Sequence, residues 1–453
     1  MKNLVEKYNV PGPRYTSYPT VPFWKSNPLE LNDWTDSIVR NYSSFGTEEL
    51  SLYIHLPYCE SLCTFCGCHK RITKNHKVEA PYIDAVIKEW ELYKVHFDFE
   101  PVIRELHFGG GTPTFFEADQ LIRLVRAIFG KDSIDPKETE LSFEAHPNNT
   151  TKEHLEKLYA FGFRRLSLGI QDYSPTVQQA INRIQPFENV KEVHDLARSI
   201  GYTSISHDLV FGLPKQQMVD ILDTVEKTLL LNPDRISLYS YAHVPWIKGN
   251  GQRGFDESDL PQDSEKRALY EEAKRTLEAE GYVEIGMDHF ALAHDDLAIA
   301  FKEKNLHRNF MGYTTQNTNF LLGLGMSAIS DSWFGFAQNE KNTEKYMELV
   351  NNGQIPIFRG HILDDVDLEI RKYILDLMCH FETILDESSE RKEMHTSIKK
   401  GLNEMVKDGL VVIEGNKVTV TEAGIAYVRN CCMAFDQDLA NSEQRDNMFS
   451  KTV

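Results

Sequence analysis

The chain has 453 residues, of which 41% are hydrophobic and 26% are charged, and its formal net charge is -19. This length exceeds what one hydrophobic core usually serves, so two or more domains are expected, and the acidity disfavours nucleic acid or an anionic membrane as the main partner. No stretch approaches the roughly 20 consecutive apolar residues of a membrane span, and the first residues lack the apolar region of a secretory signal, so a cytoplasmic protein is expected.

Residues 1–40 are expected to form an arm in front of the first domain. They contain an irregular segment, residues 11–20, that is rich in proline and tyrosine. This segment is too irregular for a regular element and too aromatic for a disordered tail. We therefore expect the arm to close as a lid over the functional site.

Residues 41–355 alternate short apolar runs with longer amphipathic segments. The runs are rich in Leu, Ile, Val and aromatic residues, and they predict strands at 52–54, 105–108, 141–144, 166–170, 205–210 and 236–239. Between two of them, residues 151–162 predict a helix with Leu155 and Leu158 on one face and Gly162 at its end. Repeated strand–helix units predict an α/β fold with a parallel sheet, either a partial or a full (β/α) barrel.

Polar side chains recur where these predicted strands end, including Glu144, Gln171 and Asp208. In α/β barrels the active site lies at the C-terminal ends of the strands. Strand ends are always more polar than strand middles, but carboxylate, amide and imidazole groups at successive ends favour a functional site there.

Residues 356–453 predict a mostly helical C-terminal domain that contains one hairpin. Its strands, at 410–413 and 417–420, flank a turn at Gly415 and Asn416. Helices with such a hairpin are typical of winged-helix modules, some of which bind DNA. Residues 391–453 hold as many acidic as basic residues, so a packing or lid role is favoured.

Four of the seven cysteines lie within ten residues, at Cys59, Cys63, Cys66 and Cys68. A tight cluster in a reducing compartment indicates metal or redox chemistry, whereas the three scattered cysteines are expected to be buried. The first three can hold three corners of a [4Fe–4S] cluster and leave one iron open. A structural zinc site with Cys68 as fourth ligand is the alternative, although four cysteines in ten residues suit a tetrahedron poorly.

This spacing, placed directly after a first predicted strand, resembles the signature of the radical S-adenosylmethionine (SAM) superfamily. The glycine turn at 109–113 follows the second strand, where that superfamily contacts the amino group of SAM, and its glycines allow close backbone approach. The Gly67-Cys68 pair after the cysteine motif and the motifs at 13–19, 286–290 and 307–310 together resemble those of oxygen-independent coproporphyrinogen III oxidases. This resemblance covers nearly the whole chain. Two positions depart from that family's pattern, because Ser240 and Met311 stand where members have Asn and Gln.

The resemblance implies an oxidoreductase of haem biosynthesis that uses 5′-deoxyadenosyl radicals to convert two propionates of coproporphyrinogen III to vinyls, giving protoporphyrinogen IX. It implies a [4Fe–4S] cluster on Cys59, Cys63 and Cys66, and two SAM molecules per chain. The residues implied to line the two SAM sites are Tyr53, Phe65, Gly110, Gly111, Thr112, Glu144, Gln171, Arg183, Asp208, Ala242 and Ile329.

Cys68 lies two residues beyond Cys66 on the same loop, so we expect it to take part in catalysis, with a passive buried residue as the alternative. The substrate implied by the resemblance carries four propionates that need nearby cations. Arg308 and His307 are the first candidates for this role, followed by Arg14. An electron donor and an acceptor are implied but not identified, and we expect a monomer without nucleic-acid or membrane partners.

Two other functions remain open. A haem chaperone of the same fold is one, although such relatives typically lack both the cysteine corresponding to Cys68 and the Pro-Arg-Tyr segment at 13–15. An iron–sulfur sensor whose winged helix binds nucleic acid is the other.

Overall fold

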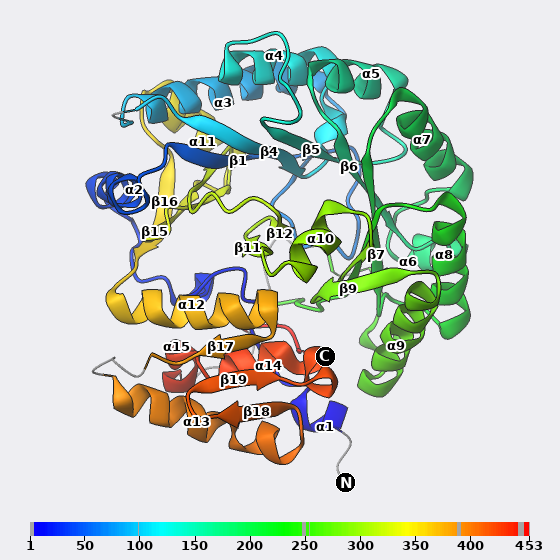
Figure 1. Ribbon diagram of the computed structural model, residues 1–453. Coiled ribbons are helices and arrows are strands. Elements are labelled where there is room, and N and C mark those ends of the chain that lie inside the picture. The colour runs from blue at the N-terminus through cyan, green and yellow to red at the C-terminus, as the bar shows by residue number, and fades with distance from the viewer. Residues whose placement is uncertain are drawn as a thin grey trace.

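The computed structural model describes residues 4–97, 99–246, 251–252, 254–386, 391–442 and 448–452. Its centre is a 12-stranded sheet in the order β16-β15-β14-β13-β1-β4-β5-β6-β7-β8-β10-β9. The sheet curves into an incomplete barrel with helices on its outer side (Figure 1). Its edge strands, β16 and β9, do not pair with each other, so the barrel is open. Of the two predicted forms, the partial barrel is therefore the one observed.

The middle strands of the sheet run parallel, and each predicted strand lies within one of them. They are β1 (Glu49–Leu56), β4 (Val102–Gly110), β5 (Glu140–Ala145), β6 (Arg165–Gln171), β7 (Ser204–Phe211), β8 (Arg235–Ser240) and β13 (Leu321–Leu324). Antiparallel strands extend both edges, namely β9 (Tyr282–Gly286), β10 (His289–Leu292), β14 (Ile329–Asp331), β15 (Gly335–Asn339) and β16 (Ile357–Ile362). The sheet thus continues to Ile362, past the expected boundary at residue 355, and the division into three segments stays a prediction.

Helices connect the parallel strands and cover the convex face of the sheet (Figure 1). They include α2 (Leu31–Phe45), α3 (Glu79–Lys94), α4 (Ala118–Phe129), α5 (Lys152–Phe161), α6 (Pro175–Ala180), α7 (Phe187–Ile200), α8 (Met218–Leu231), α9 (Asp263–Ala279) and α11 (Thr343–Asn351). The short helix α10 (Asp296–Lys302) follows β10 and lies toward the inside of the ring of strands instead (Figure 1). In α5, Leu155 and Leu158 are fully buried, the Thr151 side chain accepts a hydrogen bond from the His154 N–H, and Gly162 ends the helix at φ 138°. This is the predicted amphipathic helix. Within the described part of the chain, no helix combines the length and apolar composition needed to cross a bilayer.

The C-terminal module follows β16 and has its own hydrophobic core, with Leu377, Leu402, Val418 and Phe435 fully buried. It comprises α12 (Asp365–His380), β17 (Glu382–Ile384), α13 (Lys392–Lys407), β18 (Val411–Glu414), β19 (Lys417–Val420), α14 (Val428–Met433) and α15 (Gln437–Asn441). The predicted hairpin is confirmed, and β17 joins it in an antiparallel sheet of winged-helix type. The scattered cysteines, Cys379, Cys431 and Cys432, are buried as expected.

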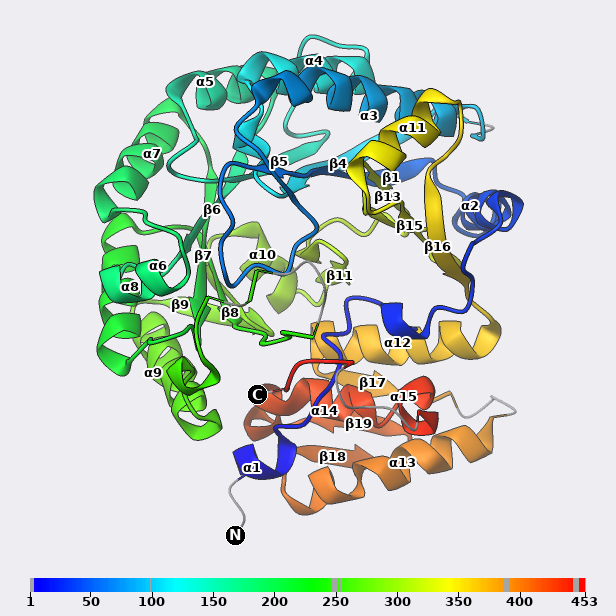
Figure 2. The same ribbon diagram turned by 180° about the vertical axis from the view of Figure 1, so that it is seen from behind.

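The described residues at the start of the N-terminal arm pack against this C-terminal module, beginning with α1 (Leu4–Tyr8), whereas the end of the arm belongs to α2 on the sheet. Figure 2 shows the two ends of the described chain side by side on the module. The Gly12 N–H donates to the Ser450 carbonyl at 3.0 Å, and the Thr452 N–H donates to the Val10 carbonyl at 2.9 Å. The buried Arg429 guanidinium donates to carbonyls of both ends, those of Gly12, Pro13, Lys451 and Thr452. Arg429 therefore ties the arm to the C-terminal tail.

Replacing Arg429 by Leu should loosen both ends of the chain. The leucine keeps the bulk but leaves several buried carbonyls unsatisfied, at about 1–3 kcal/mol each. We expect amide hydrogen exchange of Gly12 and Thr452 to accelerate at least about tenfold, equivalent to about 1.4 kcal/mol. Arg275→Leu, which removes an exposed arginine paired within α9, is the control and should leave these rates unchanged. Unchanged exchange in the Arg429 variant would contradict this role.

Candidate functional site

The clustered cysteines lie on the loop between β1 and α3, which crosses the C-terminal edge of the parallel strands (Figure 2). At the base of the loop, the short strands β2 (Tyr58–Cys59) and β3 (Arg71–Ile72) pair in parallel. Midway along it, Thr64 donates through its N–H to the Ile181 carbonyl and through Oγ1 to the Ala180 carbonyl, both at 2.9 Å. The loop is therefore fixed to the end of α6.

Three of the four clustered cysteines, Cys59, Cys63 and Cys66, line a cavity of about 230 Å³. Thr112 Oγ1 lies 3.3 Å from Cys59 Sγ, and Arg183 Nη1 lies 3.9 Å from Cys63 Sγ, so hydrogen-bond donors point at two of the sulfurs. Such donors orient and stabilise thiolate ligands. Three thiols on one loop can hold three corners of a [4Fe–4S] cluster and leave one iron open, whereas a zinc tetrahedron would need a fourth ligand such as His146 or Glu60, which line the same cavity.

Cys68 is exposed and does not line this cavity, but its thiol contacts that of Cys66. The hydrogen bond from Cys68 lowers the pKa of the Cys66 thiol, while the same contact raises the pKa of Cys68. The nearby Glu144 charge raises the pKa of Cys68 further. Cys68 therefore lies between a predicted cluster ligand and a predicted SAM contact.

The glycine turn after β4 lets the cysteine loop approach the sheet. β1 and β4 pair in parallel register, with Leu56 beside Gly110. A Cβ on Gly111 would lie 2.5 Å from the Pro57 carbonyl oxygen and 3.0 Å from Cys59 Sγ, closer than real Cβ atoms come to backbone. Gly110 has φ 121°, and its N–H donates to Glu144 Oε2 at 3.3 Å. The turn can adopt this position only without side chains.

Tyr53, Glu144 and Asp208 come together inside the barrel, from β1, β5 and β7. Burial raises the pKa of Tyr53 and of Asp208, and the negative charge of Glu144 adds to this effect in both. The pKa of Asp208 is raised to about 6. Ser167 Oγ donates to Asp208 Oδ2 at 2.6 Å, and His107 Nε2 lies 3.7 Å from Glu144 Oε1. Two carboxylates in a partly desolvated site can accept from sugar hydroxyls or balance a cation.

Gln171 and Arg183 meet at the end of β6. Arg183 donates to the Gly169 carbonyl, and a Cβ on Gly169 would lie 3.0 Å from both Arg183 Nη2 and Gln171 Nε2. Gln171 has φ 71°, a left-handed conformation that is uncommon for residues other than glycine. The two side chains therefore converge where the cysteine loop crosses β6.

Phe65 and Ala242 are joined by Gln252, which no sequence motif marks. Its Nε2 donates to the Phe65 carbonyl at 3.1 Å and to the Ala242 carbonyl at 2.9 Å, so it ties the cysteine loop to the end of β8. A lone glutamine distant in sequence gives no pattern from which this role could be predicted. Ile329 lies on β14, and its backbone approaches Gly323, the residue that pairs with Tyr53 on β13.

Several basic side chains gather where the arm covers the barrel. Arg14 Nη1 lies 3.0 Å from Asp288 Oδ2, and its Nη2 donates to the Ser240 carbonyl at 2.9 Å, at the C-terminal end of β8. Burial, followed by the charge of Arg14, lowers the pKa of Lys266 to about 8 and that of Arg429 to about 9. The sequence motifs marked neither Lys266 nor Arg429, because each is isolated in the sequence and reaches the group only through folding.

Arg308, on β11 (His307–Asn309), is 4% exposed and lacks a carboxylate partner among the described residues. Its Nη2 donates to the Arg14 carbonyl at 3.4 Å, and its guanidinium lies 4.5 Å from the centre of the Tyr313 ring. In the part of the chain that the structure describes, Nε and Nη1 have no hydrogen-bond partner. A buried cation with free donors is costly unless an anion satisfies it.

His307 lies elsewhere, in a cavity of about 500 Å³ that it shares with Lys304 and with Asp376 and His380 of α12. Burial lowers its pKa to about 4, so the ring is neutral at pH 7. A neutral imidazole supplies no charge for a propionate, so the structure favours Arg308 over His307 for that predicted role.

Residues 53–228 match the family model of the radical SAM superfamily. The oxygen-independent coproporphyrinogen III oxidase of Escherichia coli (strain K12) is 36% identical over 457 residues, which cover 99% of this chain and 98% of that protein. The protein of the same description from Helicobacter pylori (strain J99 / ATCC 700824) is 37% identical over 452 residues, with the same coverage. A solved structure described as coproporphyrinogen III oxidase (HemN) from Escherichia coli, a radical SAM enzyme, superposes with a TM-score of 0.88 at 36% identity and covers 94% of this chain and 98% of that one.

Two glycines beside the cysteines provide a matched test of the site. Gly111→Ala should displace the loop, because the new Cβ meets the Pro57 carbonyl and Cys59 Sγ, whereas Gly67→Ala adds a Cβ with nothing within 4 Å. We expect the first variant to retain less than about half of the wild-type iron and sulfide after anaerobic reconstitution, and the second to retain all of it. Equal iron content in both variants would show that the loop tolerates the clash.

Proposed function

Because this chain belongs to the family of oxygen-independent coproporphyrinogen III oxidases within the radical SAM superfamily, we propose that it catalyses the oxidative decarboxylation of coproporphyrinogen III to protoporphyrinogen IX. One structural observation supports this most directly. The cysteine cavity and the unsatisfied guanidinium of Arg308 belong to the same end of the barrel, since Arg308 contacts Arg14 and Arg14 binds the end of β8. The first suits a cluster and the second suits a substrate carboxylate.

As a radical SAM enzyme, the protein uses a [4Fe–4S] cluster and SAM. When bound, these supply a 5′-deoxyadenosyl radical that removes hydrogen from the substrate. We propose that Cys59, Cys63 and Cys66 hold the cluster, with Thr112 and Arg183 donating toward its sulfur ligands. The residues proposed to surround two SAM molecules are Tyr53, Phe65, Gly110, Gly111, Thr112, Glu144, Gln171, Arg183, Asp208, Ala242 and Ile329.

The remaining side chains of the site bind and enclose the substrate in this proposal. Arg308 offers two donors without a partner among the described residues, Nε and Nη1, to a carboxylate. Arg14 reaches the same place from the arm, held by Asp288 and the end of β8. Since the arm backbone contacts Arg308, the arm must move for a propionate to enter, and its return excludes water from the site.

The positions of two residues favour an oxidase over a haem chaperone. Cys68, whose counterpart such relatives typically lack, contacts Cys66, and Arg14 of the Pro-Arg-Tyr segment lies beside Arg308. A nucleic-acid-binding sensor is disfavoured by the net charge of -19. We further propose that the protein works in a reducing compartment such as the cytoplasm, because its seven free thiols need reducing conditions. We also propose that it is a monomer and that it uses a separate electron donor and electron acceptor.

The activity is tested with protein purified and reconstituted anaerobically, then given coproporphyrinogen III, SAM and a reductant. We expect SAM-dependent release of carbon dioxide and formation of protoporphyrinogen, followed by porphyrin fluorescence after oxidation. Reconstituted protein that cleaves SAM without consuming coproporphyrinogen III would refute the proposed substrate.

Cys68→Ser separates a catalytic thiol from a cluster ligand. Because Cys68 lies outside the cysteine cavity, the variant should keep the iron content and absorption of the wild type, whereas Cys66→Ser should lose them. We expect Cys68→Ser to lose decarboxylation by about 10²-fold or more, as when a proton-transfer group is removed. Loss of iron would make Cys68 a ligand, and full activity would make it passive.

Arg308→Met tests the substrate carboxylate site. The variant should raise the KM for coproporphyrinogen III roughly 10- to 100-fold, reflecting about 1.5–3 kcal/mol for a charge-assisted hydrogen bond. Iron content should be unchanged, and the thermal midpoint should stay equal or rise, because a buried charge without a carboxylate partner has been removed. Arg308→Lys keeps the charge without the fork and should give an intermediate KM. If Arg308→Met lowers the thermal midpoint and leaves the KM unchanged, Arg308 stabilises the fold and does not bind the substrate.

A further inference from the structure

The segment that carries the cysteines is basic in an otherwise acidic protein. Residues 61–78 contain no Asp or Glu, but they contain Lys70, Arg71, Lys74 and Lys77, while the whole chain has a net charge of -19. This local reversal of charge coincides with the loop that we propose to hold the cluster. We call residues 61–78 the basic face.

Most charges of the basic face are not neutralised by the protein. Among the described residues, no carboxylate lies within 4.0 Å of the ammonium groups of Lys70, Lys74 or Lys77, whereas Arg71 pairs with Glu344 at 2.9 Å. Lys74 and Lys77 are exposed. Lys70 Nζ donates to the carbonyls of Cys66 and Cys68, at 3.3 and 3.2 Å, so one positive charge lies directly on the cysteine loop.

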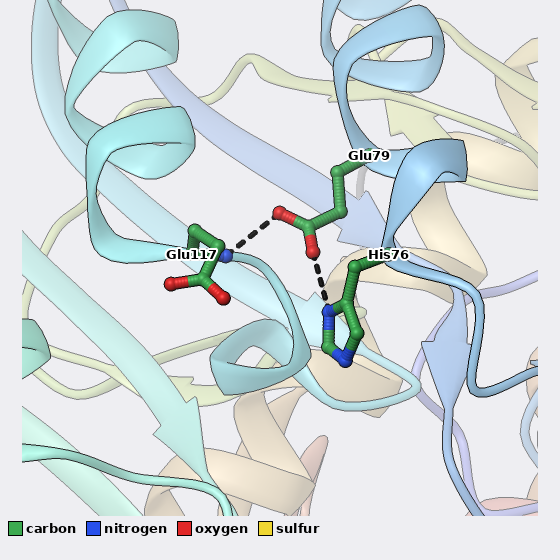
Figure 3. A group of neighbouring side chains, drawn as sticks. All are labelled: His76, Glu79 and Glu117. Atoms are coloured by element: carbon green, nitrogen blue, oxygen red, sulfur yellow. Dashed lines mark hydrogen bonds and ion pairs between the residues drawn. The ribbon is translucent and has the colours of Figure 1, made fainter.

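The basic face has a fixed shape because hydrogen bonds attach its C-terminal end, near His76, to the barrel. Figure 3 shows the buried Glu79 carboxylate between His76 and Glu117. Its Oε1 lies 2.7 Å from His76 Nδ1, and its Oε2 accepts from the Glu117 N–H at 2.8 Å. The His76 ring also stacks on Phe115 at 4.6 Å. Two exposed acids lie near His76: Glu117 at this end, and Glu60, which also lines the cysteine cavity.

Exposed apolar side chains accompany these cations. Leu62 is 37% exposed and Ile72 40% exposed within the basic face, and Ile184, 58% exposed, lines the cysteine cavity. Apolar side chains next to uncompensated charges are typical of transient protein interfaces. The three cysteines that would hold the cluster are only half-buried beneath this surface. A protein that docks here therefore brings its redox group close to them.

We propose that the basic face is the docking surface for an acidic one-electron carrier protein that reduces the cluster. One electron leaves the reduced carrier, which is oxidised by one electron, and the oxidised [4Fe–4S]²⁺ cluster becomes [4Fe–4S]¹⁺; no bond or proton is transferred. The interface rests on the cluster of the proposed function but not on its tetrapyrrole substrate. Opposite charges accelerate such an encounter by about 10- to 10³-fold, and salt screens the effect.

The test uses the reconstituted enzyme and an acidic flavodoxin in its reduced form as the probe. Cluster reduction is followed by stopped-flow absorbance, without tetrapyrrole, for the wild type and for Lys74→Glu/Lys77→Glu. Photoreduced 5-deazariboflavin, a small uncharged reductant, is measured in parallel. At an ionic strength of about 0.02 M, the ratio of the flavodoxin rate to the deazariboflavin rate should fall at least about tenfold in the variant. At about 0.5 M the variant and the wild type should converge.

The matched control is Lys392→Glu/Lys400→Glu, which makes the same charge change on exposed residues of α13 in the C-terminal module. Its rate ratio should equal that of the wild type, because α13 is remote from the cysteine loop. Three results would overturn the proposal: an unchanged ratio in Lys74→Glu/Lys77→Glu, an equal fall in the control, or a fall that persists at high salt. All of these outcomes can be read even if the enzyme fails to consume coproporphyrinogen III.

Discussion

The close approach of the cysteine loop to the glycine turn after β4 is the constraint on which the rest of the site depends. The Pro57 carbonyl and Cys59 Sγ occupy the space that a side chain on Gly111 would need. This contact follows from the parallel register of β1 and β4, which brings the ends of both strands to one edge of the sheet. Three thiols, two carboxylates and the loop anchors on α6 are then positioned relative to one rigid element.

Charge is distributed unevenly over this framework. The net charge of -19 keeps anionic surfaces away from most of the protein, yet positive charge concentrates in two places at the open end of the barrel. Inside, Arg14, Lys266, Arg308 and Arg429 gather near Asp288. The pKa values of Lys266 and Arg429 are lowered, and two donors of Arg308 have no partner among the described residues, so this group favours an anionic ligand. Outside, the basic face covers the cysteine loop. The inner group suits a polycarboxylate, and the outer one suits an acidic protein.

The two ends of the chain meet at this same place. Arg429, from the C-terminal module, donates to carbonyls of the arm and of the C-terminal tail, and the arm in turn carries Arg14 to the barrel. The C-terminal module therefore holds the arm in place, and through Arg429 it also adds a cation to the group beside Arg14. This arrangement gives the winged-helix-like module a structural purpose that needs no DNA.

The sequence by itself determined the features that depend on local pattern. Alternating apolar runs and amphipathic stretches identified the parallel strands and the helix α5, and a turn at Gly415 identified the β18–β19 hairpin, because burial of one face imposes a period on neighbouring residues. The cysteine spacing and the glycine turn identified the chemistry, since three ligands on one loop need no information from the rest of the chain. Only the tertiary structure decided that the barrel stays open, that His307 lines a cavity apart from the buried Arg308, and that Gln252, Lys266 and Arg429 belong to the site. Those residues are isolated in the sequence, and they meet only because long-range packing and hydrogen bonds to distant backbone carbonyls bring them together.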